Sequence, residues 1–275
     1  MRARNLLLVL LLLAGCGSTP KPADPPRLKA ALETESDGAR RYERGDYVVA
    51  ARRFDEAARI YASIDDDAGA VRNRLHLART ELAQGRAEAA LLALPGNLSL
   101  ESSLLQAQAE LALNRLEAAQ QSLAAANAQC ATACPQLASL RLLQAREALT
   151  AQRAAEALAH AEAALKLLQD GHQAAETGNA WRLIAAARLA TGDAAGALPA
   201  AGAALDIDRR LALPEKIARD WLLIGDIRKA LGAPDTATAY RRAADVAQAA
   251  GLAEITSLAA QALAGTGPVN GPAPR

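Results

Sequence analysis

Aromatic residues are scarce in this chain: they make up 3% of its 275 residues, with one Phe and two Trp. Hydrophobic residues nevertheless reach 51%, and Ala and Leu carry most of that fraction. Because Ala and Leu favour helices, whereas strands favour β-branched and aromatic residues, the composition predicts an all-α protein. The formal net charge is only +1. A chain so close to neutrality has no global field that would attract nucleic acid, so no nucleic-acid partner is expected.

Motifs of catalysis are also missing from the sequence. His76, His160 and His172 stand apart, and no His-x₃-His or Glu-x₂-His spacing indicates a metal site. There is no Gly-x-Ser-x-Gly elbow, glycine-rich phosphate loop or dinucleotide fingerprint. The acidic run 65–67 lacks the spaced carboxylates of a calcium loop and is predicted to be a solvated loop before a helix. The sequence therefore predicts neither an enzyme nor a bound cofactor or metal.

The longest N-terminal apolar run, residues 6–13, is too short to span a bilayer, which needs about 20 residues. Arg2 and Arg4 precede it and small residues follow it, a pattern typical of a secretory signal peptide. Residues 13–16, Leu-Ala-Gly-Cys, resemble the lipobox of bacterial lipoproteins. The resemblance implies that residues 1–15 are removed and that Cys16 is acylated as the new N-terminus. An ordinary signal peptide with a chance cysteine is the alternative.

A lipidated Cys16 would place the protein on a membrane, because two or more acyl chains hold a protein there stably. Gly17, and not Asp, follows this cysteine. In the lipoproteins that the chain resembles, this favours the periplasmic face of the outer membrane, with the inner membrane as the alternative. Loss of Arg2 and Arg4 with the signal would change the net charge from +1 to −1.

Cys130 and Cys134 are the other two cysteines of the chain. Exported proteins meet an oxidising compartment, and an i,i+4 pair near a helix end can have the Cα separation that a disulfide needs. A disulfide is predicted, with two free thiols as the alternative. Its closed loop is short, so the expected stabilisation is modest. Two thiolates fall short of the four ligands that structural zinc prefers.

The ends of the mature chain differ in composition from its middle. Residues 16–27 are Pro-rich and predict an extended tether behind the lipidated cysteine. Residues 265–275 form a Gly/Pro-rich tail that is predicted to be disordered. Residues 28–264 form the predicted helical domain, in which residues 252–264 read as a final amphipathic helix that covers an exposed apolar face.

The helical domain repeats itself. Six turn signals, at residues 45, 85, 114, 152, 192 and 232, are mostly close to 40 residues apart, with one shorter interval. A small residue precedes each of the last five turns, and small and apolar residues follow the turns. The former are Ala78, Ala107, Ala145, Ala185 and Gly225; the latter are Ala50, Phe54, Ala57, Ala90, Leu94, Ala119, Leu123, Ala126, Ala157, Ala161, Ala164, Ala197, Ala201 and Ala204.

Trp181-(x₂)-Ile184-Ala185 and Trp221-(x₂)-Ile224-Gly225 resemble the first-helix signature of the tetratricopeptide repeat family. The resemblance covers most of residues 28–264 and implies a right-handed solenoid of about six helix pairs with a C-terminal capping helix. The units depart from the family in their length and in having Ala where Phe or Tyr is usual. A plain helical bundle or coiled coil is the alternative, but no sustained heptad supports it.

In this family the first helix of each pair lines a concave face. The resemblance assigns to that face Arg72, Leu75, Arg79, Leu82, Glu101, Leu104, Gln108, Leu111, Ser139, Leu142, Arg146, Leu149, Asn179, Arg182, Leu189, Arg219, Leu222, Asp226 and Lys229. The candidate partner groove consists of Arg72, Arg79, Gln108, Arg146, Arg182 and Arg219. Alternating Leu and Arg suits a peptide with apolar and acidic side chains, since guanidinium binds carboxylate bidentately. Ordinary solvated arginines are the alternative.

These features together predict a membrane-anchored periplasmic scaffold that binds another envelope protein or peptide, in an assembly, secretion or pilus-type complex. A ligand-binding or enzymatic envelope protein is one alternative. A structural lipoprotein that links membrane and cell wall is another. The repeat fold by itself does not decide among them.

Overall fold

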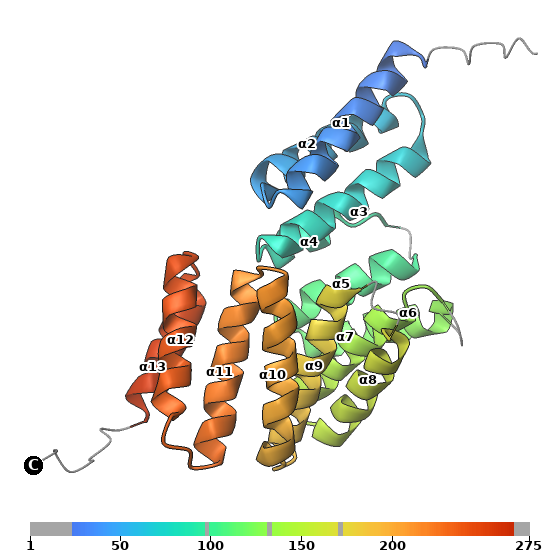
Figure 1. Ribbon diagram of the computed structural model, residues 1–275. Coiled ribbons are helices and arrows are strands. Elements are labelled where there is room, and N and C mark those ends of the chain that lie inside the picture. The colour runs from blue at the N-terminus through green and yellow to red at the C-terminus, as the bar shows by residue number, and fades with distance from the viewer. Residues whose placement is uncertain (1–23, 97–98, 131–133, 170–172, 267–275) are drawn as a thin grey trace, which may run out of the picture. The chain divides into compact units, whose positions relative to one another are not determined.

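The computed structural model describes residues 24–96, 99–130, 134–169 and 173–266, and all regular secondary structure within these ranges is helical (Figure 1). The chain divides into two compact units, Met1–Asn73 and Arg74–Arg275. No helix in the described ranges has the length and apolar character needed to cross a membrane. Cys16 and the predicted signal peptide lie outside the described residues.

The N-terminal unit contains α1 (Pro26–Glu43), α2 (Tyr47–Ala62) and the start of α3 (Asp67–Ala83). α1 begins at Pro26, inside the stretch assigned to the tether, because a proline in the first helical turn loses no helical hydrogen bond. A small core of Ala31, Ala57, Tyr61 and Ala70 joins the three helices.

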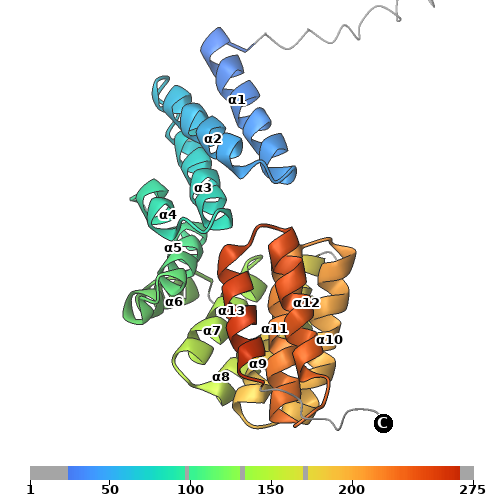
Figure 2. The ribbon, with the colours of Figure 1, turned by 90° about the vertical axis from the view of Figure 1, so that its left-hand side faces the viewer.

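The C-terminal unit continues with α4 (Ala87–Ala93), α5 (Leu100–Ala112), α6 (Leu116–Cys130), α7 (Leu137–Thr150), α8 (Ala154–Leu167), α9 (Ala174–Ala190), α10 (Ala194–Arg210), α11 (Pro214–Ala230), α12 (Thr236–Ala249) and α13 (Ala253–Ala264). Consecutive helices from α5 to α12 pack as pairs, and each pair also packs against the next. Figures 1 and 2 show α10, α11, α12 and α13 side by side.

The six predicted turns are confirmed by the backbone. Each contains a residue with positive φ at the predicted position: Gly45, Gly85, Asn114, Gln152, Gly192 and Gly232. This left-handed conformation ends the preceding helix and reverses the chain within three residues, and glycine adopts it at the least cost. The helix pairs therefore follow from local turn chemistry.

The predicted small residues do lie where helices cross. Ala78, Ala107, Ala145 and Ala185 are fully buried, as are most of the alanines predicted in the second helices. Gly225 faces the ring of Tyr240 so closely that a Cβ at this position would overlap the ring. Because alanine and glycine project little beyond the backbone, the helices approach closely and form a core with few aromatic side chains.

Two details depart from a regular repeat. α4 has only 7 residues, and Leu92 on it is 88% exposed. The next helix, α5, begins with a capping box in which Ser99 and Ser102 satisfy each other's backbone N–H groups. At the other end, α13 buries Ile255 and Ala259 against its neighbours, so the predicted final amphipathic helix is confirmed.

Candidate functional site

The odd-numbered helices of the C-terminal unit share one face. α5 contacts α7, α7 contacts α9, α9 contacts α11, and α11 contacts α13. No comparable contact joins successive even-numbered helices among the described residues. The array is therefore tighter on its odd-numbered side, which we call the inner face. This is the side to which the sequence assigned the partner groove.

In the N-terminal unit, Arg72 is already bound by a carboxylate of its own chain. Its Nε and Nη2 donate to the Oε1 and Oε2 atoms of Glu35, at 2.6 and 2.8 Å, and its guanidinium stacks over Tyr61. The Arg72 hydrogen bond is the largest of the effects that lower the pKa of Glu35 to about 2. Arg72 thus supports the packing of α1 and α3.

Arg79, in the C-terminal unit, makes a similar bond. Its Nη2 donates to Glu101 Oε1 at 2.5 Å and so links α3 to α5. Both side chains remain about 40% exposed. An exposed pair of this kind contributes little stability, so Glu101 is exchangeable for an outside carboxylate at small cost.

The prediction that Arg182 faces solvent is corrected by the structure. Arg182 Nε donates to Asp220 Oδ1 at 2.6 Å, and its Nη2 binds Asp208 Oδ2. Both carboxylates are fully buried, so Arg182 is the cation that neutralises them. Arg182 joins α9, α10 and α11 and is not available to a partner.

The apolar anchors predicted for the groove are also corrected. Leu75, Leu104, Leu111 and Leu142 are buried, each with at most 8% of its surface exposed. Leu104 and Leu142 belong to core clusters between helices. The alternation of Leu and Arg along these helices therefore separates core from surface and is not a row of contacts for a peptide.

Arg146 on α7 is the predicted groove residue that stays without a carboxylate partner. Its side chain is exposed and makes no ion pair with any described residue. Desolvation by the surrounding protein lowers the pKa of Arg146, and the charge of Arg219 on α11 lowers it further, while Glu215 opposes the shift. Arg146 is therefore an exposed cation that lies near a second cation, Arg219.

Two cations of α11 complete this region. Arg219 bonds only to Glu215 of its own helix, at 3.0 Å. Lys216 is half-buried and makes no ion pair with a described residue. Burial lowers the pKa of Lys216, and this effect is larger than the opposing effect of the Asp208 charge. Arg146, Lys216 and Arg219 are called the inner cation cluster below. Lys216 was missed from the sequence because the repeat register does not assign it to the groove.

Gln108 on α5 is exposed, as predicted for a groove residue. Its side chain makes none of the hydrogen bonds that join neighbouring helices among the described residues. Gln108 therefore lies on the same inner face as an uncharged, exposed residue.

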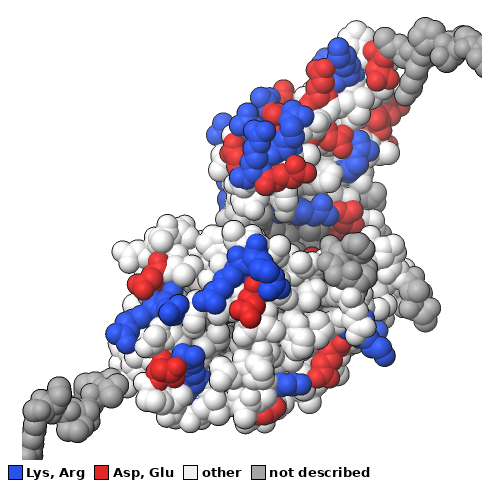
Figure 3. Space-filling model, viewed as in Figure 1, with Lys and Arg blue, Asp and Glu red and all other residues white. Residues whose placement is uncertain are grey.

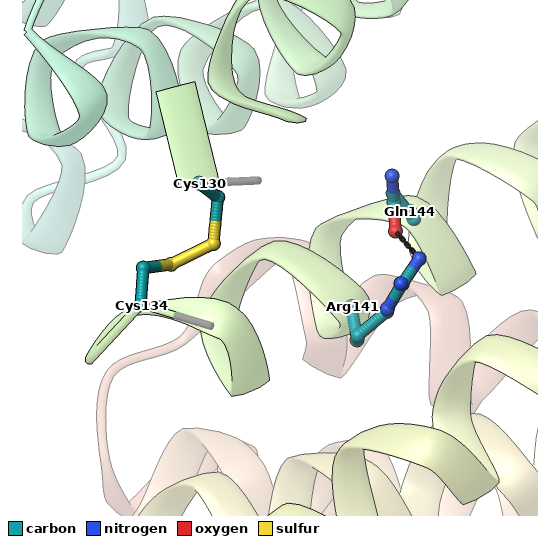
Figure 4. The surroundings of a disulfide bond; sticks show 4 residues. All are labelled: Cys130, Cys134, Arg141 and Gln144. Carbon is teal, nitrogen blue, oxygen red and sulfur yellow. Dashed lines mark hydrogen bonds between the residues drawn. A yellow bond between two sulfur atoms is a disulfide. The ribbon is translucent and has the colours of Figure 1, made fainter. Parts of the chain in front are cut away.

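A disulfide joins Cys130 to Cys134, with a Cα–Cα distance of 5.2 Å (Figure 4). Cys130 is the last residue of α6 and is buried among Leu104, Leu123 and Leu140. Cys134 lies three residues before α7. The bridge therefore ties the end of one helix pair to the start of the next.

A cleft of about 210 Å³ between α6, α7 and α8 contains His160. Burial and the charge of Arg141 lower the pKa of His160, and Glu156 lies 3.7 Å away. The other acid there, Glu147, is held by Arg153 and Gln120. His76 lies on α3, and His172 is outside the described residues. In the described ranges no group of three metal-ligating side chains comes together.

No protein-family model matches the chain, and no curated protein matches it. A solved structure does: the crystal structure of the apo form of RapI, with a TM-score of 0.58 and 13% sequence identity. The match covers 86% of this chain and 71% of RapI. The fold fits a tetratricopeptide-type repeat. At this identity the likeness concerns the fold alone, so function has to come from the site.

Proposed function

We propose that this protein is a membrane-anchored adaptor whose inner face binds an acidic segment of another envelope protein. In this proposal the helix pairs wind as a right-handed solenoid of about six units, and α13 is the terminal cap. Repeat arrays of this type expose extended surfaces that bind protein or peptide partners. The RapI-like fold is compatible with such a scaffold.

The inner cation cluster carries the proposal. Arg219 lies close enough for its charge to lower the pKa of Arg146, and Arg146 has no carboxylate within ion-pair distance in the described structure. A carboxylate from outside would relieve this repulsion and form charge-assisted hydrogen bonds with the guanidiniums. The electrostatics of this region therefore favour an anionic partner over a cationic or apolar one.

The proposed location is supported by the sequence of residues 2–16, which resembles a lipoprotein signal in which Cys16 would carry the lipid. The Cys130–Cys134 disulfide is compatible with an oxidising compartment outside the cytoplasm. A Pro-rich stretch behind Cys16 would hold the helices away from the lipid surface. The outer membrane is the proposed site, since Gly17 follows Cys16.

Photo-crosslinking in cells tests the binding face. A crosslinking amino acid replaces Gln108 on the inner face or, as a matched control, Gln121, which is exposed on α6. We expect a discrete protein adduct from position 108 and none from position 121. Equal adducts from both positions, or an adduct from 121 alone, would refute the inner face as the binding surface.

A further inference from the structure

A second basic region surrounds Trp221 on the opposite side of α11 from Arg219. Trp221 and Arg219 are two residues apart, and two helical residues are about 200° apart around the axis. The guanidinium carbons of Arg209 and Arg242 lie 5.2 and 5.0 Å from the centre of the Trp221 ring. Arg209 comes from α10 and Arg242 from α12, so three helices build the arrangement.

These side chains line a cleft of about 560 Å³. Ile217 and Val246 supply apolar walls, and Asp245 completes the lining. Trp221 is only 9% exposed and forms part of the core, so the ring is a rigid support. Figure 3 shows groups of Lys and Arg side chains, with Asp and Glu beside them, over α10, α11 and α12 on an otherwise mainly uncharged surface.

The two guanidiniums are held in place and yet keep free donors. Stacking on an indole uses the face of a guanidinium and leaves its N–H groups, which point outward in the guanidinium plane, available. Arg242 makes no ion pair with any described residue. Arg209 reaches only Asp206 of its own helix, at 4.0 Å, and that carboxylate is 68% exposed. Asp245 lines the cleft, but it makes no ion pair with either guanidinium in the described structure.

The net charge of the cleft indicates the charge of the anion that would fit it. Arg209 and Arg242 contribute two positive charges and Asp245 one negative charge, which leaves one positive charge to be matched. A single carboxylate matches this charge, whereas a dianionic phosphate would leave the cleft with a net negative charge. The apolar walls beside the arginines add a place for an aliphatic side chain.

We infer that the Trp221 cleft is a second binding site, on the side of α11 opposite the inner cation cluster, for an acidic peptide segment of a protein. An Asp or Glu side chain of that segment lies between Arg209 and Arg242, and a neighbouring aliphatic side chain packs on Ile217 and Val246. The adaptor thereby holds two acidic protein segments at once, one on each side of α11.

The probe is a capped pentapeptide of alternating leucine and glutamate, titrated into the full chain at constant ionic strength. The readout is the indole N–H resonance of Trp221 in an NMR spectrum, with Trp181 as the internal reference. We expect the Trp221 resonance to shift to saturation while that of Trp181 stays in place. A peptide with glutamine in place of glutamate should bind at least tenfold more weakly, because it lacks the carboxylate.

A double variant, Arg209→Gln with Arg242→Gln, should weaken the glutamate peptide at least tenfold. The matched control, Arg210→Gln with Arg241→Gln, removes the same charge from the adjacent positions of the same two helices and should change affinity less than twofold. Equal weakening by both variants would show that the effect comes from long-range charge and would refute the Trp221 cleft as the binding site. An unmoved Trp221 resonance would also overturn it, as would inorganic phosphate binding at Trp221 more tightly than the peptide.

Discussion

Asp208 and Asp220 are two buried carboxylates that share one guanidinium, that of Arg182. One oxygen of each, Asp208 Oδ1 and Asp220 Oδ2, has no hydrogen-bond partner in the structure. Burial is the largest cause of the raised pKa of Asp220, which reaches about 6, and the charge of Asp208 adds to it against the opposing effect of Arg182. Two acids with one base leave an excess negative charge, which a proton removes.

Replacing Asp220 with Asn should make stability less dependent on pH. A carboxyl whose folded pKa lies above its unfolded value of 3.8 stabilises the fold at low pH, and this contribution is lost as pH rises through about 6. The Asp220→Asn variant keeps a neutral group at this position. At pH 7.5 it should be more stable than the native chain by about 2 kcal/mol, measured by urea unfolding.

At pH 3 the same variant should differ little from the native chain, because Asp220 is then largely protonated in both the folded and the unfolded chain. Asp206→Asn, an exposed acid on α10, is the control and should leave the pH profile unchanged. If the native chain gained stability between pH 5 and 7.5 relative to the Asp220→Asn variant, a raised pKa of Asp220 in the folded chain would be contradicted.

The role of Arg182 could not be predicted from the sequence. Its position in the repeat predicted an exposed groove residue, but its partners are 26 and 38 residues away in the chain. Nothing in the local pattern reveals that two neighbouring helices bury acids opposite it. The available signal was the residue type itself, since these aspartates stand at positions where the adjacent helices bury Ala and Ile.

At the scale of elements, the turns between paired helices use the same backbone conformation with different residues. Gly192 has φ of +87°, and a Cβ added there would meet no atom within 4 Å. Gln152 adopts φ of +59° in the equivalent turn. A side chain in this conformation strains the backbone even where space is free, by about 1–2 kcal/mol.

Gly192→Ala should therefore destabilise the protein by about 1 kcal/mol, and Gln152→Gly should stabilise it by up to the same amount. Urea unfolding of the two variants measures both effects. Because the changes are opposite at matched positions, a common error in the baseline cannot produce the pattern. A loss of stability in Gln152→Gly would show that the glutamine side chain has a stabilising role of its own.

The disulfide acts between elements, at the junction of α6 and α7. Cys134→Ala removes the bridge and leaves Cys130 in its buried cluster, and it removes only the partly buried sulfur that packs against that cluster. For so short a loop the chain-entropy model gives a loss of about 2 kcal/mol. Thermal unfolding measures it, and a reductant should bring the native chain down to the variant. If the reductant left the melting temperature of the native chain unchanged, a stabilising role of the disulfide would be contradicted.

Helices and turns were predictable because their signals are local. Gly45, Gly85, Gly192 and Gly232 mark chain reversals by residue type, and alanines at helical spacing mark the crossings. The short length of α4 was not predicted, although Pro95-Gly96, which follows its C-cap Leu94, is a strong stop signal. α1 begins two residues before the predicted helical domain, because a Pro-rich composition indicates a tether although a proline can also begin a helix.

For the whole molecule, the proposed anchor makes a direct prediction. Cys16→Ser should leave the helical fold unchanged and release the protein from membranes, since acylation needs the cysteine thiol. Fractionation after a salt wash, with helix content measured by circular dichroism, checks both parts. A variant that still sediments with membranes would contradict lipidation at Cys16 as the sole anchor.

The sequence assigned a partner groove to the inner face, but it overestimated how many side chains are available there. Leu104 and Leu142 belong to the core, Arg72 and Arg79 bind acids of the same chain, and Arg182 is paired with two buried aspartates. Register within a repeat predicts the face of a helix, whereas the availability of a side chain depends on its neighbours in space. Only the structure shows that Arg146 is left without a partner.

The most direct test of the adaptor proposal is a comparison of two charge reversals in the full chain. Arg146→Glu with Arg219→Glu changes the inner cation cluster, and Arg210→Glu with Arg241→Glu makes the same charge change elsewhere. Affinity for the partner crosslinked from position 108 is measured at two salt concentrations. The proposal predicts a loss of at least tenfold for the inner variant, with a weaker salt dependence than the native chain, and little loss for the control. Equal affinities of the two variants would contradict binding through the inner face.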